Sequence, residues 1–274
     1  MKLLPWRRKS RAKPISEPVQ FARSLSYQCA AVQGIGSREQ QEDDWTLVNA
    51  SDVTQARKMG ILAVVADGMG GMANGALASS TGIRVITNAF QQMNRSMPLE
   101  RQLTGAIRYA AEAVRSLLHG GGGSTVIACI MHEEQLYYAG VGDSFLYLLR
   151  QGTLIRINRE QNVLHQRYLE WIRDGIVETS AKQGVSQPHA VTCFLGADPL
   201  SDVDCLHRAM PLENGDTLLL CSDGIGGVLS PEEIKMCIGM PDANAGAAAL
   251  KQAVLSKGRR HQDNFTGIVI RCVK

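Results

Sequence analysis

The chain of 274 residues is 45% hydrophobic and 20% charged, so it has enough apolar material for a folded core, which excludes disorder as its main state. Aromatic residues make up only 5%, which argues against a surface that stacks bases, and charged or polar residues interrupt every apolar run before it could cross a membrane. The net charge of +3 is unevenly placed, because residues 1–18 hold six Lys and Arg against one Glu, a balance of +5 that leaves −2 for residues 19–274.

The charge of the N-terminus predicts a basic, flexible arm over residues 1–25, followed by one domain over residues 26–274. The arm lacks the apolar stretch of a secretory signal, because Leu3, Leu4 and Trp6 are followed at once by charges. The seven cysteines are scattered and form no CxxC pair, which indicates neither a disulfide framework nor a zinc site. These patterns predict a cytoplasmic protein, and they give no reason to expect a nucleic-acid partner.

Apolar runs of strand length, many of them β-branched, recur along the chain. They predict strands at residues 27–32, 45–48, 61–66, 125–131, 136–141, 145–149, 154–157, 203–206, 217–221 and 268–273. Apolar residues at a period of about 3.6, and in one case a capping sequence, predict helices. These lie at residues 76–93, 99–118, 231–238 and 243–257. Strands outnumber helices and do not alternate singly with them, which favours the α+β class. Residues 161–199 are the least regular and predict an inserted flap.

Five acidic sites lie where apolar runs begin or end. They are Glu42-Asp43-Asp44, Asp67-Gly68, Asp143-Ser144, Asp223-Gly224 and Asp263-Asn264. The preference of Asp for turns explains any one of them. Gathered at one sheet edge, however, they would crowd negative charges that need hard cations to neutralise them. Oxygen ligands favour Mg²⁺ or Mn²⁺, and the chain has neither an HxH nor an HExxH pattern for zinc.

The segment from Gly68 to Ala73 also fits the GxGxxG/A fingerprint of a dinucleotide-binding turn, which would make the protein an oxidoreductase. That fingerprint requires an acid about 20 residues later, at the end of the next strand, to bind the ribose. The next acid after Asp67 is Glu100, and the residues between them predict a helix. The nucleotide hypothesis is therefore weaker than the metal hypothesis.

Six motifs resemble, in the same order, those of the metal-dependent protein serine/threonine phosphatases, the protein phosphatase 2C family, in its bacterial type. They are GSREQQED at residues 36–43, ADGMGG at 66–71, GST at 123–125, VGDS at 141–144, CSDG at 221–224 and DNFT at 263–266. The resemblance runs from about residue 26 to residue 273. It implies a four-layer αββα sandwich with two central, mainly antiparallel sheets and a two-metal site at one edge.

The resemblance also implies roles for individual residues. The implied metal ligands are Asp43, Asp67, Asp223, Asp263 and the backbone carbonyl of Gly68. Glu42 would contact a metal through water, and Asp143 would serve a third, weaker ion. Arg38 would bind the substrate phosphate with its planar, permanently charged fork, and it would form the catalytic set with Asp43 and Asp67. The implied cofactors are two Mn²⁺ or Mg²⁺ ions and that third ion.

The implied activity is hydrolysis of phosphoserine and phosphothreonine in proteins, by direct attack of a water that bridges the two metals. No cysteine lies in a nucleophile motif, which agrees with direct attack. The implied partners are phosphoprotein substrates and an opposing Ser/Thr kinase, and we expect a monomer without a transmembrane segment. A second hypothesis is a catalytically weak phosphatase fold that binds phosphoproteins in signalling, although none of the four metal-site Asp residues is missing.

The chain departs from the family at several positions. Gln41 stands where the family often has Asn, and Phe145 stands where it often has Arg. Met69 stands where some eukaryotic members have a His that acts as general acid, so the sequence assigns no general acid. Residues 161–199 depart most, which leaves the choice of substrate open.

Overall fold

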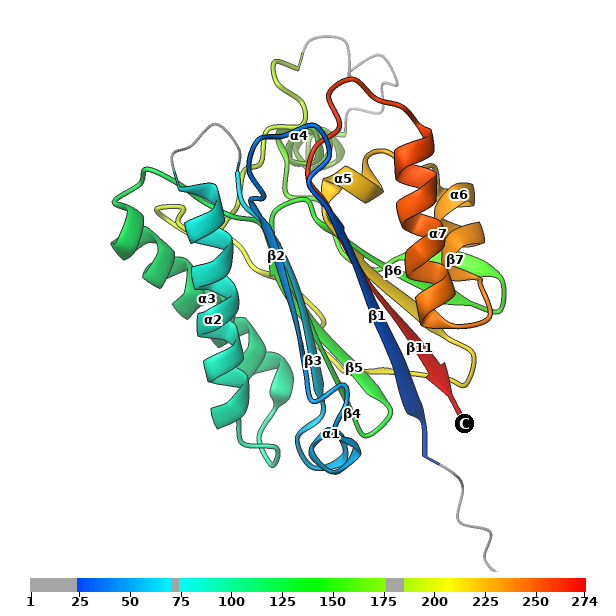
Figure 1. Ribbon diagram of the computed structural model, residues 1–274. Coiled ribbons are helices and arrows are strands. Elements are labelled where there is room, and N and C mark those ends of the chain that lie inside the picture. The colour runs from blue at the N-terminus through cyan, green and yellow to red at the C-terminus, as the bar shows by residue number, and fades with distance from the viewer. Residues whose placement is uncertain (1–23, 70–73, 176–184) are drawn as a thin grey trace, which may run out of the picture.

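The computed structural model describes residues 24–69, 74–175 and 185–274 (Figure 1). Two β-sheets lie face to face at the centre of the molecule. In spatial order, the first contains β1 (Ser26–Gly34), β11 (Phe265–Val273), β10 (Thr217–Cys221), β6 (Phe145–Arg150) and β7 (Thr153–Arg156). The second contains β2 (Asp43–Val48), β3 (Ile61–Asp67), β4 (Val126–His132), β5 (Gln135–Val141) and β8 (Asp204–Cys205), and β9 (Met210–Pro211) also pairs with β5. The pairings between these strands are antiparallel, as expected.

Helices cover the outer face of each sheet, which completes the expected αββα sandwich of the α+β class (Figure 1). Helices α2 (Gly75–Gln92) and α3 (Leu99–Leu118) cover the second sheet, and α6 (Pro231–Ile238) and α7 (Ala243–Ser256) cover the first. These four helices confirm the predicted ones to within one residue at each end. The capping sequence before α6 acts as expected, because the Ser230 hydroxyl accepts from the Glu233 N–H and the Glu233 carboxylate accepts from the Ser230 N–H.

The ten predicted strands are confirmed. Inner strands such as β3, β4 and β10 have apolar runs that are buried on both faces, whereas the edge strands β1, β2 and β7 are only partly buried. In β3, Ile61 and Val65 face the core between the two sheets, whereas Leu62 and Val64 face α2 and α3. A strand between a second sheet and a helix layer needs apolar residues at every position, which is why its sequence does not alternate with polar residues. Gln151 and Gly152 form the turn between β6 and β7, with φ of 49° and 76°.

The structure contains further elements beyond the predicted ones: α1 (Val53–Met59), α4 (Val163–Arg173), the single turn α5 (Asp223–Gly226) and β9. Helices α1 and α4 bury no residue fully. Helix α1 is short and largely polar, whereas α4 has Leu164, Tyr168 and Trp171 at helical spacing, a pattern that could have predicted it. Helix α4 lies within residues 161–199, the segment that is the least regular in sequence. Residues 176–184 of that segment lie outside the described residues.

Two other predicted features also fall partly outside the described residues. Most of the basic arm does so, although Leu25 is buried and packs into the core between the sheets. The other is the end of the ADGMGG motif at residues 70–71. Among the helices that the structure describes, none combines the length and apolar character needed to cross a membrane.

Candidate active site

The ends of several strands bring the predicted acidic residues to one edge of the sandwich. Asp43 opens β2 and Asp67 closes β3, and the two residues are paired directly across these strands. Asp223 follows the end of β10 and begins α5, and Asp263 lies two residues before β11. Asp143 follows β5, and it lines a cavity together with Asp223 and Asp263. The structure thus gathers all five Asp residues that the sequence singled out.

The pKa values of these carboxyl groups show how strongly burial and mutual repulsion act on them. Burial raises the pKa of Asp67 well above its ordinary value, and the charge of Asp43 raises it further. The pKa of Asp43 rises to about 6, mainly through burial, although a hydrogen bond from Ser222 opposes the rise. Burial and the charge of Asp263 raise the pKa of Asp223. The pKa of Asp143 rises to about 7 through burial and then the charge of Asp223.

One oxygen of this cluster indicates what the site can hold. The Ser222 hydroxyl donates to Oδ2 of Asp43 at 2.8 Å, but Oδ1 of Asp43 is buried without a hydrogen-bond partner in the described structure. Buried polar atoms normally have partners, so this oxygen lacks a donor or a cation. The site offers oxygen donors that carry negative charge, which is the donor set that Mg²⁺ and Mn²⁺ prefer. The residues present therefore fit hard divalent cations.

The carboxylates lie near one another, but they do not form a complete set of metal ligands. Within the described ranges, no three Asp, Glu, His or Cys side chains converge closely enough to hold a metal ion as they stand. In addition, Nη2 of Arg38 donates to Oδ2 of Asp263 at 2.5 Å. A cation at this edge has to compete with Arg38 for the Asp263 carboxylate.

Backbone contacts bring Gly68 and Glu42 together beside the cluster. The Gly68 N–H donates to the Glu42 carbonyl at 3.1 Å, and the Ser79 hydroxyl donates to the same carbonyl at 2.6 Å. A Cβ on Gly68 would lie 2.3 Å from the Gly75 carbonyl oxygen and 2.6 Å from the Glu42 carbonyl oxygen. Only glycine fits this close approach of two chain segments, which is what the position after Asp67 requires.

Asn264 organises the loop that carries Arg38, a role that the sequence alone does not reveal. Its Nδ2 donates to the Ile35 carbonyl at 2.8 Å and to the Gln40 carbonyl at 3.1 Å. Its Oδ1 accepts from the Glu42 N–H at 2.8 Å, and its side chain is buried. These bonds fix residues 35–42 against the start of β11. The only signal in the sequence is that Asn264 follows Asp263 inside a motif.

Ser222 has a comparable role that sequence reasoning missed. Its hydroxyl donates to Asp43 and accepts from the Thr266 N–H at 3.0 Å, so it joins the two sheets at the acidic edge. The residue is fully buried. Ser222 therefore orients the Asp43 carboxylate, and its position before Asp223 in the CSDG motif is the signal that could have found it.

Phe145 stands where the family often has Arg, and the structure places another arginine, Arg156, beside it. The guanidinium of Arg156 lies over the Phe145 ring at 4.1 Å, and it forms an ion pair with Glu160. The charge of Arg156 lowers the pKa of Asp143, against the larger effect of burial. A guanidinium thus stands near Asp143 even though the residue after Ser144 is not Arg.

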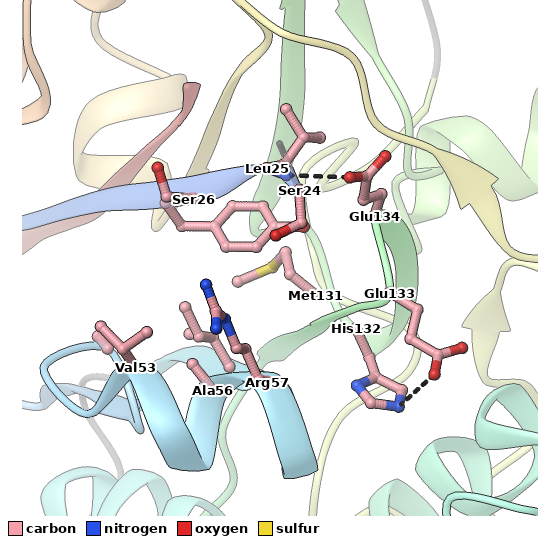
Figure 2. A pocket seen from close by; sticks show the side chains of 13 residues that line it. Ser24, Leu25, Ser26, Val53, Ala56, Arg57, Met131, His132, Glu133 and Glu134 are labelled. Atoms are coloured by element: carbon pink, nitrogen blue, oxygen red, sulfur yellow. Dashed lines mark hydrogen bonds and ion pairs between the residues drawn. The ribbon is translucent and has the colours of Figure 1, made fainter. Parts of the chain in front are cut away.

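A different cavity, of about 240 Å³, lies at the opposite edge of the sandwich (Figure 2). It is bounded by the start of β1, by α1 and by the turn between β4 and β5, and its walls include Leu25, Ala56 and Met131. Figure 2 shows the Leu25 N–H bonded to Glu134, at 3.0 Å, and Arg57 reaching from α1 toward the start of β1. None of the five clustered Asp residues lines this cavity, so it is separate from the candidate active site.

Comparisons with known proteins agree with this fold and site. A family profile described as protein phosphatase 2C matches residues 35–240. The serine/threonine phosphatase stp of Listeria welshimeri is 29% identical over 184 residues, which cover 64% of this chain and 70% of that protein. The crystal structure of the Mycobacterium tuberculosis serine/threonine phosphatase PstP/Ppp matches with a TM-score of 0.73 at 25% identity, over 92% of this chain and 100% of that one.

A second similar structure carries metal. It is the catalytic domain of the serine/threonine protein phosphatase PstP in complex with two manganese ions, with a TM-score of 0.72 at 25% identity, over 92% of this chain and 100% of that one. The profile match covers most of the chain, including β2, β3, β5 and β10, which bring four of the five acidic residues to one edge, whereas Asp263 and β11 lie beyond it. This chain therefore belongs to the protein phosphatase 2C family.

Proposed function

We propose that this protein is a metal-dependent phosphatase that hydrolyses phosphoserine and phosphothreonine in proteins. The observation that carries the proposal is the cluster of Asp43, Asp67, Asp223 and Asp263 at one edge of the sandwich, where burial and mutual repulsion raise the pKa values of the first three and divalent cations would neutralise the charge. The relatives named as serine/threonine phosphatases, and the one that holds two manganese ions, support the same activity. We assign it to residues 26–274 as a single catalytic domain.

We assign two Mn²⁺ or Mg²⁺ ions to these four carboxylates and the Gly68 carbonyl, with Glu42 beside them. When bound, such a pair supplies an activated water as nucleophile and neutralises charge that develops on the phosphoryl oxygens. The chain's own part is to hold its carboxylates charged and aligned, which burial opposes and the Ser222 hydrogen bond to Asp43 favours. We assign a third, weaker ion to Asp143 with Asp223.

Arg38 is assigned to the substrate phosphate. Its guanidinium is exposed on one side and paired with Asp263 on the other. A phosphate can take up the remaining donors of the guanidinium in a bidentate arrangement, which orients the phosphoryl group beside the carboxylates. Because Asn264 fixes the loop on which Arg38 lies, this orientation is built into the fold.

Three further assignments complete the proposal. A phosphatase of this class opposes a protein kinase, so we assign a Ser/Thr kinase as its functional counterpart, and we assign a monomer. We place the protein in the cytoplasm, because its seven cysteines form no disulfide and this is typical of a reducing compartment. A catalytically weak binding module is disfavoured, because such a module has no need to gather four carboxylates that repel one another at one edge.

The experiment is a phosphatase assay on a phosphothreonine peptide with Mn²⁺, Mg²⁺ or EDTA, using the wild type, Asp67→Asn and Asp44→Asn. Asp44 is a matched control, because it adjoins Asp43 but its carboxylate accepts from the Trp45 N–H at 2.8 Å. We expect turnover to require the metal and to fall at least roughly 100-fold in Asp67→Asn alone. Turnover in EDTA, or equal losses in both variants, would overturn the proposal.

A further inference from the structure

The candidate active site opens into a cavity of about 380 Å³ that is larger than a phosphate group requires. Asp143, Asp223 and Asp263 line it, and so do Arg259 and His261, whose segment forms one wall. A water molecule occupies about 30 Å³ of liquid, so this space corresponds to about a dozen waters. It can therefore receive the phosphorylated side chain together with part of a neighbouring residue of the substrate.

The wall with Arg259 and His261 is fixed in place relative to Arg38. It belongs to the loop between α7 and β11, and this loop is anchored at the buried residue Gln262. Nε2 of Gln262 donates to the Gly224 carbonyl at 3.2 Å. The Gln262 carbonyl accepts from the Ser37 N–H at 2.8 Å and from the Ser37 hydroxyl at 2.9 Å. The loop is thus tied to α5 on one side and to the neighbour of Arg38 on the other.

The basic groups of this wall are available to a ligand. Nearby, Lys257 is committed to Glu233, with Nζ at 2.7 and 2.8 Å from the two carboxylate oxygens. Arg259 and His261, in contrast, make no hydrogen bond or ion pair to any other described residue, and both are exposed. Glu160, which also lines the cavity, is already paired with Arg156. Apart from the carboxylates assigned to the metal ions, the charged side chain of this lining that remains uncommitted is therefore that of Arg259.

Resting on the proposed function, we infer that Arg259, assisted by His261, binds an acidic side chain that flanks the phosphorylated residue. The substrate class is then a phosphopeptide with Glu or Asp next to its phosphoserine or phosphothreonine. The carboxylate would pair with the guanidinium at the cavity wall while the phosphate faces Arg38 and the carboxylate cluster. Such an exposed charge pair contributes about 1 kcal/mol, or about a fivefold preference over a neutral side chain.

The test compares two phosphothreonine peptides that differ only in Glu or Gln beside the phosphorylated residue. We expect the wild type with Mn²⁺ to prefer the Glu peptide about fivefold in kcat/KM, mainly through KM, and less so at high salt. Arg259→Ala removes the preference and Arg259→Lys keeps part of it. Arg260→Ala is the matched control, because Arg260 is an exposed neighbour that does not line the cavity, and it keeps the preference.

A binding measurement separates this inference from the proposed function. Non-hydrolysable phosphonate versions of both peptides are titrated against the same Mn²⁺-loaded proteins. A Glu preference in binding that depends on Arg259 supports the subsite even if no protein turns over the phosphopeptides, a result that would refute only the phosphatase activity. Equal affinities of the wild type for the two peptides, or an unchanged preference in Arg259→Ala, would overturn the subsite.

Discussion

Asp43 and Asp67 face each other directly across the antiparallel pair formed by β2 and β3. Directly paired residues of such strands have Cβ atoms about 4.5–5.5 Å apart, and like charges at such a pair destabilise the sheet. A shift in register to separate them is costly, because a slip of one residue would exchange the side chains of β3 between the two cores that it packs against. The apolar core between the sheets therefore holds two carboxylates together that would otherwise move apart.

This relationship predicts that Asp67→Asn changes the stability of the protein differently without and with metal. Without metal, the substitution removes a buried charge, so we expect the melting temperature in EDTA to stay the same or to rise. With Mn²⁺, the wild type gains stability by ligand binding and the variant does not. Thermal melts with and without Mn²⁺ check both statements. A variant that unfolds well below the wild type in EDTA would show that Asp67 has a structural role instead.

The raised pKa of Asp143 predicts a pH dependence of the stability of the metal-free protein. The native state holds this proton more tightly than the unfolded chain does, so the stabilisation is complete below about pH 4 and is lost as the pH rises to about 7. Relative to Asp143→Asn, the free energy of unfolding of the wild type falls over this range, on the order of 2–4 kcal/mol. Urea unfolding in EDTA across the range measures the difference. A difference independent of pH would contradict the pKa.

We expect Asn264→Asp to disrupt the site because it replaces the Nδ2 donor of Asn264 with an oxygen. The carboxylate keeps the acceptor for the Glu42 N–H but loses the donor to the Ile35 and Gln40 carbonyls, and it adds a charge beside Asp263. We expect a loss of about 2–4 kcal/mol in the free energy of unfolding, together with a higher KM.

The control for Asn264→Asp is Asn214→Asp. Oδ1 of Asn214 only accepts from the Lys274 N–H at 2.9 Å, at the other end of the fold. We expect this variant to unfold within about 0.5 kcal/mol of the wild type. Equal effects of the two substitutions would mean that the donor bonds of Asn264 do not matter.

Gly224→Ala tests the close approach that places Asp223 beside Asp263. A Cβ on Gly224 would lie 1.9 Å from the Asn264 carbonyl oxygen, so α5 or β11 must shift. We expect a loss of about 1–3 kcal/mol in the free energy of unfolding and a fall in turnover. Gly105→Ala in α3 is the matched control, because no atom lies within 4 Å of its added Cβ. Replacing this helical Gly should stabilise the protein by about 0.5–1 kcal/mol, with unchanged turnover.

Much of the fold could be predicted from the sequence because its elements are buried in a regular way. The apolar run of β3 and the capping sequence at Ser230 each carry a local signal. Helix α4 carries a weaker signal, since Leu164, Tyr168 and Trp171 have helical spacing but the helix is short and buries no residue fully. The positions of the five clustered Asp residues could likewise be predicted, because strand ends and motifs are local features.

What could not be predicted are the contacts between distant segments. The ion pair between Arg38 and Asp263 and the hydrogen bonds of Asn264 join residues more than 200 positions apart, and no local pattern encodes such a pairing. The role of Ser222 depends in the same way on how the two sheets stack. The choice of substrate could not be predicted either, because the cavity lined by Arg259 forms only when the loop of this residue packs against α5.

The central claim is that the clustered carboxylates hold the divalent ions on which hydrolysis depends. The most direct measurement is a calorimetric titration of the metal-free protein with Mn²⁺, with phosphothreonine turnover recorded at each metal concentration. The account predicts two tightly bound ions per chain, turnover that rises with their occupancy, and loss of both binding and turnover in Asp223→Asn but not in Asp44→Asn. Full turnover by the metal-free protein, or unchanged Mn²⁺ binding by Asp223→Asn, would contradict it.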